Sequence, residues 1–228
     1  MTSLGPDWIL GEDGLRLRRA ARVIVIDEAG RALLVRGHDA DQPERSWWFT
    51  VGGGIGAGES HVEAALRELR EETGLVLDAA GLEGPVLTRA GIFHFFAETC
   101  RQDEVFFLAR VAGAAAFDTA GWTEQEREVL DDLAWFTPAE LREQPLEVFP
   151  TVLPDLLERL ADGWDGVVVH LGDEYDDGDD RDGDARRFVP VPVPVPVPGP
   201  CRALALSPRE HVICAIACPQ VRFWTGTA

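Results

Sequence analysis

The 228-residue sequence contains no lysine and no asparagine. All 21 basic residues are therefore arginine, which excludes mechanisms that need a lysine: the phosphate-binding P-loop, the pyridoxal Schiff base and the ion pair of protein kinases. The lack of asparagine excludes N-linked glycosylation. Because the codons of both residues are rich in A, we attribute their absence to a GC-rich genome rather than to a special chemistry.

Cysteine, long apolar runs and positive charge are also scarce. The four cysteines are too few and too unevenly placed for the disulfide framework of a secreted domain. Residues 1–18 have no apolar core typical of a signal peptide, and no run of 18 apolar residues predicts a transmembrane helix. A net charge of −19 disfavours binding to nucleic acid or to an anionic membrane. We therefore expect a cytoplasmic protein that handles phosphates only through local arginines or bound cations.

Composition divides the chain near residue 170. Residues 1–17 are a lead-in and 18–170 a folded domain, while 171–200 are predicted to be a disordered linker. The linker contains eight acids and one arginine within residues 173–184, followed by five Val-Pro repeats that predict a semi-rigid spacer. Residues 201–228 form a short tail with one predicted helix, too short to fold alone. Free thiols there are favoured over a zinc site, because the spacing matches no common zinc module: Cys201, His211, Cys214 and Cys218.

Strands and helices interleave within the domain. Apolar patterns predict a hairpin of strands at 22–27 and 32–36, and further strands at 47–51, 86–96, 104–111 and 133–136. A helix opens at Ser60, where Glu63 completes a capping box, and stops at Gly74. Two more helices are predicted at 138–143 and 151–161. The fold class is therefore α/β or α+β with a mixed sheet.

The segment 52–75 contains the residues that point to a chemistry. On a helix, Glu68, Glu71 and Glu72 share one arc. The adjacent arc is apolar and can pack on a sheet; it consists of Val62, Ala65, Leu66, Leu69 and Thr73. Clustered carboxylates beside the backbone carbonyls of a glycine-rich turn suit Mg²⁺ or Mn²⁺, and a bound cation lets a polyphosphate dock on an acidic protein. The alternative is a solvated acidic face, partly neutralised by neighbouring arginines.

This stretch resembles the signature of the Nudix hydrolases: Gly, five residues, Glu, seven residues, then Arg-Glu-apolar-x-Glu-Glu-x-Gly-apolar. All nine positions are filled, by Gly53, Glu59, Arg67, Glu68, Leu69, Glu71, Glu72, Gly74 and Leu75. The resemblance covers about residues 18–165. One departure is Val51, where many members have proline. The resemblance implies an α/β/α sandwich with a mixed sheet, and hydrolysis of a nucleoside diphosphate linked to another moiety.

The resemblance also implies roles for these residues. Glu68, Glu71 and Glu72 would hold the divalent metals, joined by a backbone carbonyl of Gly52 or Gly53. Arg67 would orient the glutamates, and Glu59 would support the loop or a second metal. The general base would be Glu68 or an acid of a later segment, although each of the later acids is also explained as an exposed acid at a helix start: Glu124, Glu126 and Glu128.

The sequence indicates the identity of the substrate less clearly. Where some members carry a proline for ADP-ribose or a tyrosine for dinucleoside polyphosphates, this chain has Arg89 and Ala90, and the Ser-Gln-Pro-Trp segment typical of NADH hydrolysis is missing. Alternation along a strand sends one of two adjacent tryptophans inward, so the other is free to stack on a base. The candidate substrate-binding residues are Trp47, Trp48, Glu126 and Arg36, of which Arg36 is equally explained as a surface arginine.

The expected partner is a small nucleotide, and a homodimer stays open. Two other functions remain as alternatives. One is a module that senses nucleotides without hydrolysing them. The other is isomerisation of an isoprenoid diphosphate, for which Cys100 is the candidate active-site cysteine within the domain.

Overall fold

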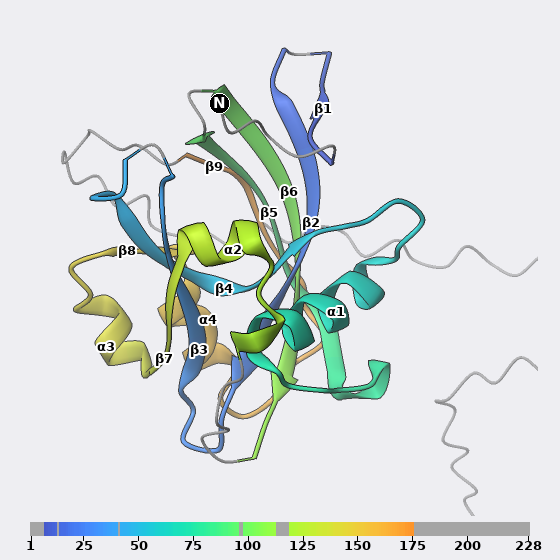
Figure 1. Ribbon diagram of the computed structural model, residues 1–228. Coiled ribbons are helices and arrows are strands. Elements are labelled where there is room, and N and C mark those ends of the chain that lie inside the picture. Colours follow the sequence, from blue (N-terminus) through green and yellow to red (C-terminus); the bar gives the residue numbers. More distant parts are fainter. Residues whose placement is uncertain (1–6, 13, 41, 96–97, 113–118, 176–228) are drawn as a thin grey trace, which may run out of the picture. The chain divides into compact units, whose positions relative to one another are not determined.

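The computed structural model describes residues 7–12, 14–40, 42–95, 98–112 and 119–175 (Figure 1). The predictions for the acidic run beyond Tyr175, for the Val-Pro repeats and for the cysteines of the tail lie outside the described residues. The helices are α1 (His61–Thr73), α2 (Glu124–Val129), α3 (Pro138–Arg142) and α4 (Leu153–Leu160). The strands are β1 (Ile9–Leu10), β2 (Arg16–Ile26), β3 (Ala32–His38), β4 (Ser46–Gly54), β5 (Leu82–Phe95), β6 (Glu98–Arg110), β7 (Leu130–Phe136), β8 (Glu147–Phe149) and β9 (Val169–Tyr175).

Within the described residues the strands form one nine-stranded sheet with the order β7-β3-β4-β2-β6-β5-β9, to which β1 adds beside β2 and β8 beside β4. The predicted hairpin is present, because β2 pairs with β3 in antiparallel register at Val25 and Leu33. Three pairings are parallel: β2 with β6, β4 with β8 and β5 with β9. The sheet is therefore mixed, as the sequence predicted.

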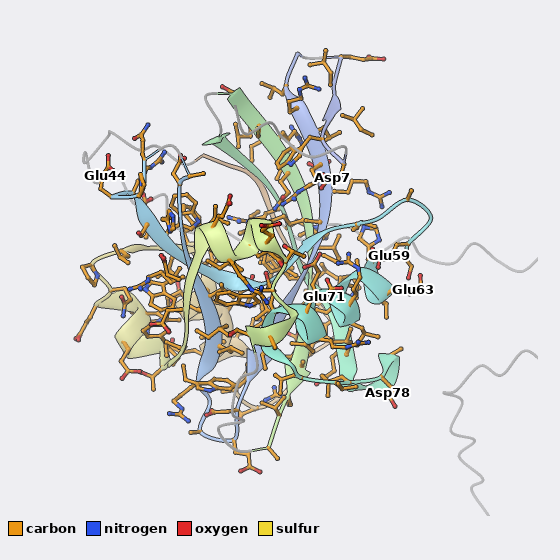
Figure 2. The ribbon with its side chains drawn as sticks, in the orientation of Figure 1. Asp7, Glu44, Glu59, Glu63, Glu71 and Asp78 are labelled. Atoms are coloured by element: carbon orange, nitrogen blue, oxygen red, sulfur yellow. The ribbon has the colours of Figure 1, made fainter. Side chains whose placement is uncertain are left out.

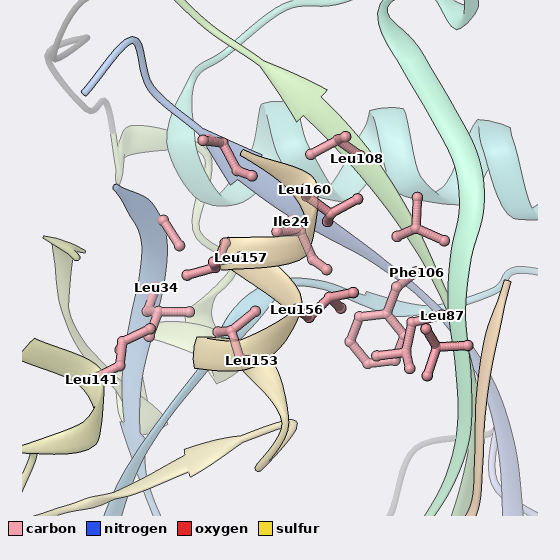
Figure 3. Packing of buried hydrophobic residues seen from close by; sticks show 14 of the residues in the cluster. Ile24, Leu34, Leu87, Phe106, Leu108, Leu141, Leu153, Leu156, Leu157 and Leu160 are labelled. Carbon is pink, nitrogen blue, oxygen red and sulfur yellow. The ribbon is translucent and has the colours of Figure 1, made fainter. Parts of the chain in front are cut away.

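Alternating side chains divide the core into two clusters, one on each face of the sheet. On β2, Val23 and Val25 pack with Leu69 of α1, whereas Ile24 packs on the opposite face. That opposite face is covered by the leucines of α4, shown with Phe106 in Figure 3: Leu153, Leu156, Leu157 and Leu160. The chain is thus an α/β/α sandwich, and α1 and α4 cover different faces of the same strands.

Helix α1 begins and ends where local sequence signals placed its ends. The Ser60 hydroxyl accepts a hydrogen bond from the Glu63 N–H at 3.2 Å, and the Glu63 carboxylate accepts one from the Ser60 N–H at 2.9 Å. Gly74 closes the helix with φ of 75°, a left-handed conformation that favours glycine. These contacts fix the first and last turns of the helix that carries the three glutamates.

Strand β9 differs from the sequence prediction. It runs from Val169 to Tyr175, so residues 171–175 continue the sheet beyond the predicted domain end at residue 170. The acidic composition of this segment suggested a linker. Asp173 is instead 3.4 Å from the guanidinium of Arg101 on β6, so part of the acidic charge is neutralised within the sheet. No helix in the described part of the chain is long and apolar enough to cross a membrane.

Candidate metal-binding and catalytic site

Three carboxylates converge on the α1 side of the sheet. Glu68 and Glu72 of α1 and Glu126 of α2 each offer an oxygen atom, and these atoms lie within 4.8 Å of one another. Glu68 is 6% exposed and Glu72 is 4% exposed, whereas Glu126 is half-buried. The alternative of a solvated acidic face is therefore wrong for Glu68 and Glu72.

Each carboxylate of the α1 pair is held by a hydrogen bond to one of its oxygens. The Gly52 N–H donates to Oε2 of Glu72 at 2.8 Å, and Nη1 of Arg67 donates to Oε1 of Glu68 at 2.7 Å. Among the described residues, no hydrogen bond is donated to the second oxygen of either group. Such hydrogen bonds on the outer side of a carboxylate are how proteins orient metal ligands.

Contacts between α1 and the segment before α2 bring Glu126 to this pair. The Trp122 indole N–H donates to the carbonyl of Glu72 at 2.9 Å. A Cβ on Gly121 would lie 2.5 Å from the carbonyl oxygen of Glu71, so only glycine permits this close approach. The short helical turn Thr119–Gly121, which precedes α2, packs on α1. No sequence pattern marked Gly121 or Trp122, because their importance comes from packing on a helix far away in the chain.

A capping box at the start of α2 fixes the direction of the Glu126 side chain. Its Oε2 accepts hydrogen bonds from the Thr123 N–H at 2.7 Å and from the Thr123 hydroxyl at 2.8 Å. Of the three candidate acids in this segment, the structure brings Glu126 to the α1 pair, whereas Glu124 and Glu128 are exposed and lie outside the carboxylate cluster. The spacing of Thr123 and Glu126 is the sequence signal that distinguishes Glu126 from its neighbours.

Arg67 binds the remaining acids of the motif. Its guanidinium donates to both oxygens of Glu59 at 2.9 Å, to Glu71 at 3.1 Å and to the carbonyl of Gly54 at 2.9 Å. Figure 2 shows Glu59 close to the start of α1 and Glu71 further along the helix. The hydrogen bonds from Arg67 lower the pKa of Glu59. Glu59 and Glu71 are thus held around one arginine, and neither belongs to the group of three oxygens.

An open pocket of about 490 Å³ lies beside this arginine. It is lined by Glu59 and Arg67, by the glycine-rich turn from Gly54 to Ala57, and by Asp7 from the N-terminal segment. The pocket gives a small ligand access to the loop that leads into α1.

Burial makes the α1 pair electrostatically unfavourable without a cation. Burial raises the pKa of Glu72 to about 8, and the nearby charge of Glu68 adds to this rise. Burial also raises the pKa of Glu68, although the hydrogen bond and charge of Arg67 oppose this rise. Carboxylates this close together in a region of low dielectric repel one another, and a divalent cation relieves that repulsion.

The glycines before α1 contribute backbone to the same place. A Cβ on Gly53 would lie 2.7–2.9 Å from the carboxylate atoms of Glu68, so the Gly53 backbone is in contact with this group. The carbonyl of Gly52, the other candidate, accepts a hydrogen bond from the Arg22 guanidinium. Of the two carbonyls that the sequence offered, Gly53 is therefore the better candidate ligand.

Two of the candidate substrate-binding residues lie on the face of the sheet opposite α1. Trp48 is 6% exposed and packs edge-on against Phe136 at 4.8 Å, within the α4-side core. Arg36 lies over the Trp48 ring at 5.8 Å and is 3.6 Å from Asp131. The pleat directs both side chains away from α1; Trp48 is buried in the core, so its prediction as a substrate contact is wrong, whereas that for Arg36 stays a prediction. Trp47 is half-buried and alternates to the α1 side.

Comparisons with known proteins point to one family. The family model of the NUDIX domain matches residues 16–157. An uncharacterized Nudix hydrolase of Yersinia pestis is 29% identical over 143 residues, which cover 62% of this chain and 70% of that protein. Among solved structures, a NUDIX hydrolase from Nitrosomonas europaea is 20% identical with a TM-score of 0.46, covering 64% of this chain and 90% of that one. The NUDIX domain of Shewanella oneidensis NrtR, solved as a complex with ADP ribose, is 20% identical with a TM-score of 0.47, covering 63% of this chain and 88% of that one.

Proposed function

Because the chain belongs to the Nudix family, we propose that it is a pyrophosphohydrolase that cleaves the diphosphate linkage of a nucleoside diphosphate derivative with Mg²⁺ or Mn²⁺. The observation that carries this proposal is the group of oxygens from Glu68, Glu72 and Glu126 within 4.8 Å of one another. Hard oxygen ligands of this kind suit Mg²⁺ and Mn²⁺ rather than softer metals.

The donor set fits a divalent metal in composition and in charge. Glu68 and Glu72 would hold it together with the carbonyl of Gly53, and Glu71, the least buried of the three α1 glutamates, is available to a second ion. Metal ions bound there would polarise the phosphoryl oxygens and lower the pKa of the attacking water.

The other residues of the site position the ligands and accept the proton. Arg67 holds Glu59, Glu68 and Glu71 in place through its five donors, which a planar guanidinium offers in a fixed geometry. Glu126 is the group best suited to accept the proton of the attacking water, because it is less buried than the α1 pair and one of its oxygens accepts no hydrogen bond from the described residues.

The substrate class follows from charge and from access. An acidic chain attracts a polyphosphate only at local arginines or bound cations, and the open pocket is lined by Arg67, the arginine that binds Glu68. Trp47 is the remaining aromatic candidate for stacking on a base, since it lies on the α1 side of β4. A small nucleotide derivative fits these features better than a nucleic acid.

A phosphate-release screen tests the proposal. The panel contains nucleoside triphosphates, oxidised nucleotides, ADP-ribose, nucleotide sugars and dinucleoside polyphosphates, each with Mg²⁺, with Mn²⁺ and with chelator. We expect metal-dependent turnover of one class, and a loss of about 10²-fold or more in Glu72→Gln. Turnover that persists in chelator, or that is unchanged in Glu72→Gln, would contradict the proposal. Tight nucleotide binding with no turnover would instead identify a sensing module.

A matched pair of variants tests the proton acceptor. Glu126→Gln removes the charge but keeps the capping box, because glutamine also accepts from the Thr123 N–H. Glu128→Gln removes a charge from the same helix at an exposed position outside the cluster. We expect kcat to fall by about 10²-fold in Glu126→Gln and to stay within about twofold in Glu128→Gln. Equal kcat values in the two variants would remove Glu126 from the site.

A further inference from the structure

A cluster of buried charges lies on the other face of the sheet from the metal-binding carboxylates. Glu104 of β6 is bound by two arginines: Nε of Arg22 donates to its Oε1 at 2.8 Å, and Nε of Arg89 donates to its Oε2. The Glu104 side chain is 1% exposed, that of Arg22 12% and that of Arg89 10%. The side-chain amide of Gln102 also donates to Oε1 of Glu104, at 2.6 Å. Glu104 therefore holds both guanidinium groups in defined orientations.

Arg22 also contacts the backbone of the glycine-rich segment that leads into α1. Its Nη1 donates to the carbonyl of Gly52, and to the carbonyl of Thr50 at 3.3 Å. Gly52 has φ of 128°, and a Cβ there would lie 2.3 Å from the carbonyl oxygen of Ala21, so no other residue type fits. The same glycine donates its N–H to Oε2 of Glu72 at 2.8 Å. One residue of irregular backbone thus connects the buried arginine to a carboxylate of the metal site.

We infer that Arg22, oriented by Glu104, is a positioning residue that fixes Gly52 and thereby holds the Glu72 carboxylate in place for the metal ion. The inference rests on the proposed function, since it assigns Arg22 and Glu104 to the support of that same site. Neither residue belongs to the three converging oxygens. Their contribution is to keep the Gly52 N–H directed at Glu72, where it occupies one oxygen and leaves the other for the metal.

The chemistry of the contact explains why an arginine is used. A guanidinium is planar and offers several donors at fixed angles, so one group can bind a carboxylate with Nε and a carbonyl with Nη1 at the same time. The ammonium of a lysine is a compact charge on a flexible stem and cannot reproduce both directions. Arg22→Lys therefore keeps the buried positive charge but loosens Gly52.

Arg89 provides a matched control. It binds the other oxygen of the same Glu104 carboxylate and is buried to a similar extent, but no described contact connects it to Gly52. Arg89→Lys therefore removes one guanidinium contact to Glu104, with a comparable loss of stability, but leaves the glycine-rich segment unchanged.

The test is direct titration of the metal-free full chain with Mn²⁺, following free Mn²⁺ by electron paramagnetic resonance, with kcat and the thermal midpoint measured on the same samples. We expect Arg22→Lys to bind Mn²⁺ about 10-fold to 100-fold more weakly than the wild type, the range typical of lost outer contacts to metal ligands. We expect Arg89→Lys to bind Mn²⁺ within about twofold of the wild type, although both variants lose thermal stability.

Each outcome decides the inference. Equal weakening of Mn²⁺ binding in the two lysine variants, or no weakening in Arg22→Lys, would overturn it. If Arg22→Lys does not fold, Glu104→Asp replaces it in the titration. This variant keeps the carboxylate and both guanidinium groups but withdraws the carboxylate from Arg22 by one methylene. Mn²⁺ affinity within twofold of the wild type would then overturn the inference. A wild-type chain that binds no Mn²⁺ would instead contradict the proposed function itself, and this inference with it.

Discussion

Glu72 and Glu104 are both buried glutamates, 4% and 2% exposed, and they sit on opposite sides of the Gly52 and Arg22 pair. Burial raises the pKa of Glu72 to about 8, and the nearby charge of Glu68 adds to the rise. Burial acts in the same direction on Glu104, but Arg89 and Arg22 overcome it and lower its pKa to about 2. The number of arginines in contact decides the sign of the shift.

Glu104 and Glu72 differ in whether the fold supplies a counter-charge. Glu104 lies between two guanidinium groups and already has its counter-charges within the fold. Glu72 accepts one backbone N–H and faces two further carboxylates, so its negative charge is not balanced by the chain. A buried carboxylate without a counter-charge takes up a proton, and we propose that a divalent cation replaces this proton at Glu72.

Removal of each charge should therefore have opposite effects on stability. Glu104→Gln leaves two buried arginines without their carboxylate, so we expect the free energy of unfolding to fall by about 3–5 kcal/mol. Glu72→Gln relieves repulsion, so the metal-free variant should be at least as stable as the wild type at pH 8. Urea unfolding with chelator measures both. Similar losses of unfolding free energy in the two variants would contradict the claim that the fold balances the charge of Glu104 but not that of Glu72.

The pH dependence of metal-free stability should show the two groups in separate windows. The pKa of Glu72 is raised from 4.5 to about 8, so the free energy of unfolding falls as pH rises from about 5 to 8, by at most about 1.4 kcal/mol per pH unit. In this range the carboxyl group loses its proton in the unfolded chain but keeps it in the fold. The pKa of Glu104 is lowered, so the stability it contributes is present above pH 4.5 and is lost as pH falls toward 2. We expect Glu72→Gln to remove most of the slope between pH 5 and 8. A slope unchanged by this substitution would assign the effect to other groups.

Gly53→Ala tests the contact between the turn and the α1 pair. The added Cβ would lie within 2.9 Å of the Glu68 carboxylate, and the free end of this side chain is easier to displace than backbone. We expect kcat to fall by about 10-fold to 100-fold, as for other changes that misplace a metal ligand, with the thermal midpoint nearly unchanged. A steady-state assay together with a thermal melt separates the two effects; a variant with wild-type kcat would show that Glu68 tolerates the shift.

The smallest effect should come from Trp122→Phe, which removes one hydrogen bond to the carbonyl of Glu72 and keeps most of the ring packing. We expect a loss of about 1 kcal/mol in the free energy of unfolding. Activity should fall less than in Glu126→Gln, because the Glu126 carboxylate itself is unchanged. Chemical denaturation and kcat measured side by side check this. No change in either would mean that the close approach of Gly121 alone determines how the segment before α2 packs on α1.

Local sequence signals were sufficient for α1 and its motif. Ser60, Glu63 and Gly74 define the helix ends through contacts within one turn, and the mixed sheet followed from the order of elements. The helices on both faces of the sheet were implied by the family resemblance. Alternation correctly placed one of two adjacent tryptophans in the core, and the structure shows that it is Trp48.

Non-local packing decided what the sequence did not. The place of Glu126 beside α1 depends on Gly121 and Trp122, whose contacts join residues about 50 positions apart in the chain. Arg36 lies on the face away from the site because β3 pairs with β4 opposite Trp48. Strand β9 was missed because its acidic composition resembles a linker until its pairing with β5 is known.

The most direct test of the account is the effect of Mg²⁺ on the thermal midpoint at pH 8, where unfolding is compared with and without the ion for the wild type, Glu72→Gln and Glu128→Gln. Saturating Mg²⁺ stabilises a site of defined affinity by about 2.7 kcal/mol at 100 times its Kd. We predict a clear rise in the wild type and in Glu128→Gln, and a much smaller rise in Glu72→Gln. An equal rise in all three proteins, or no rise in any, would contradict the claim that the buried carboxylates form a metal site.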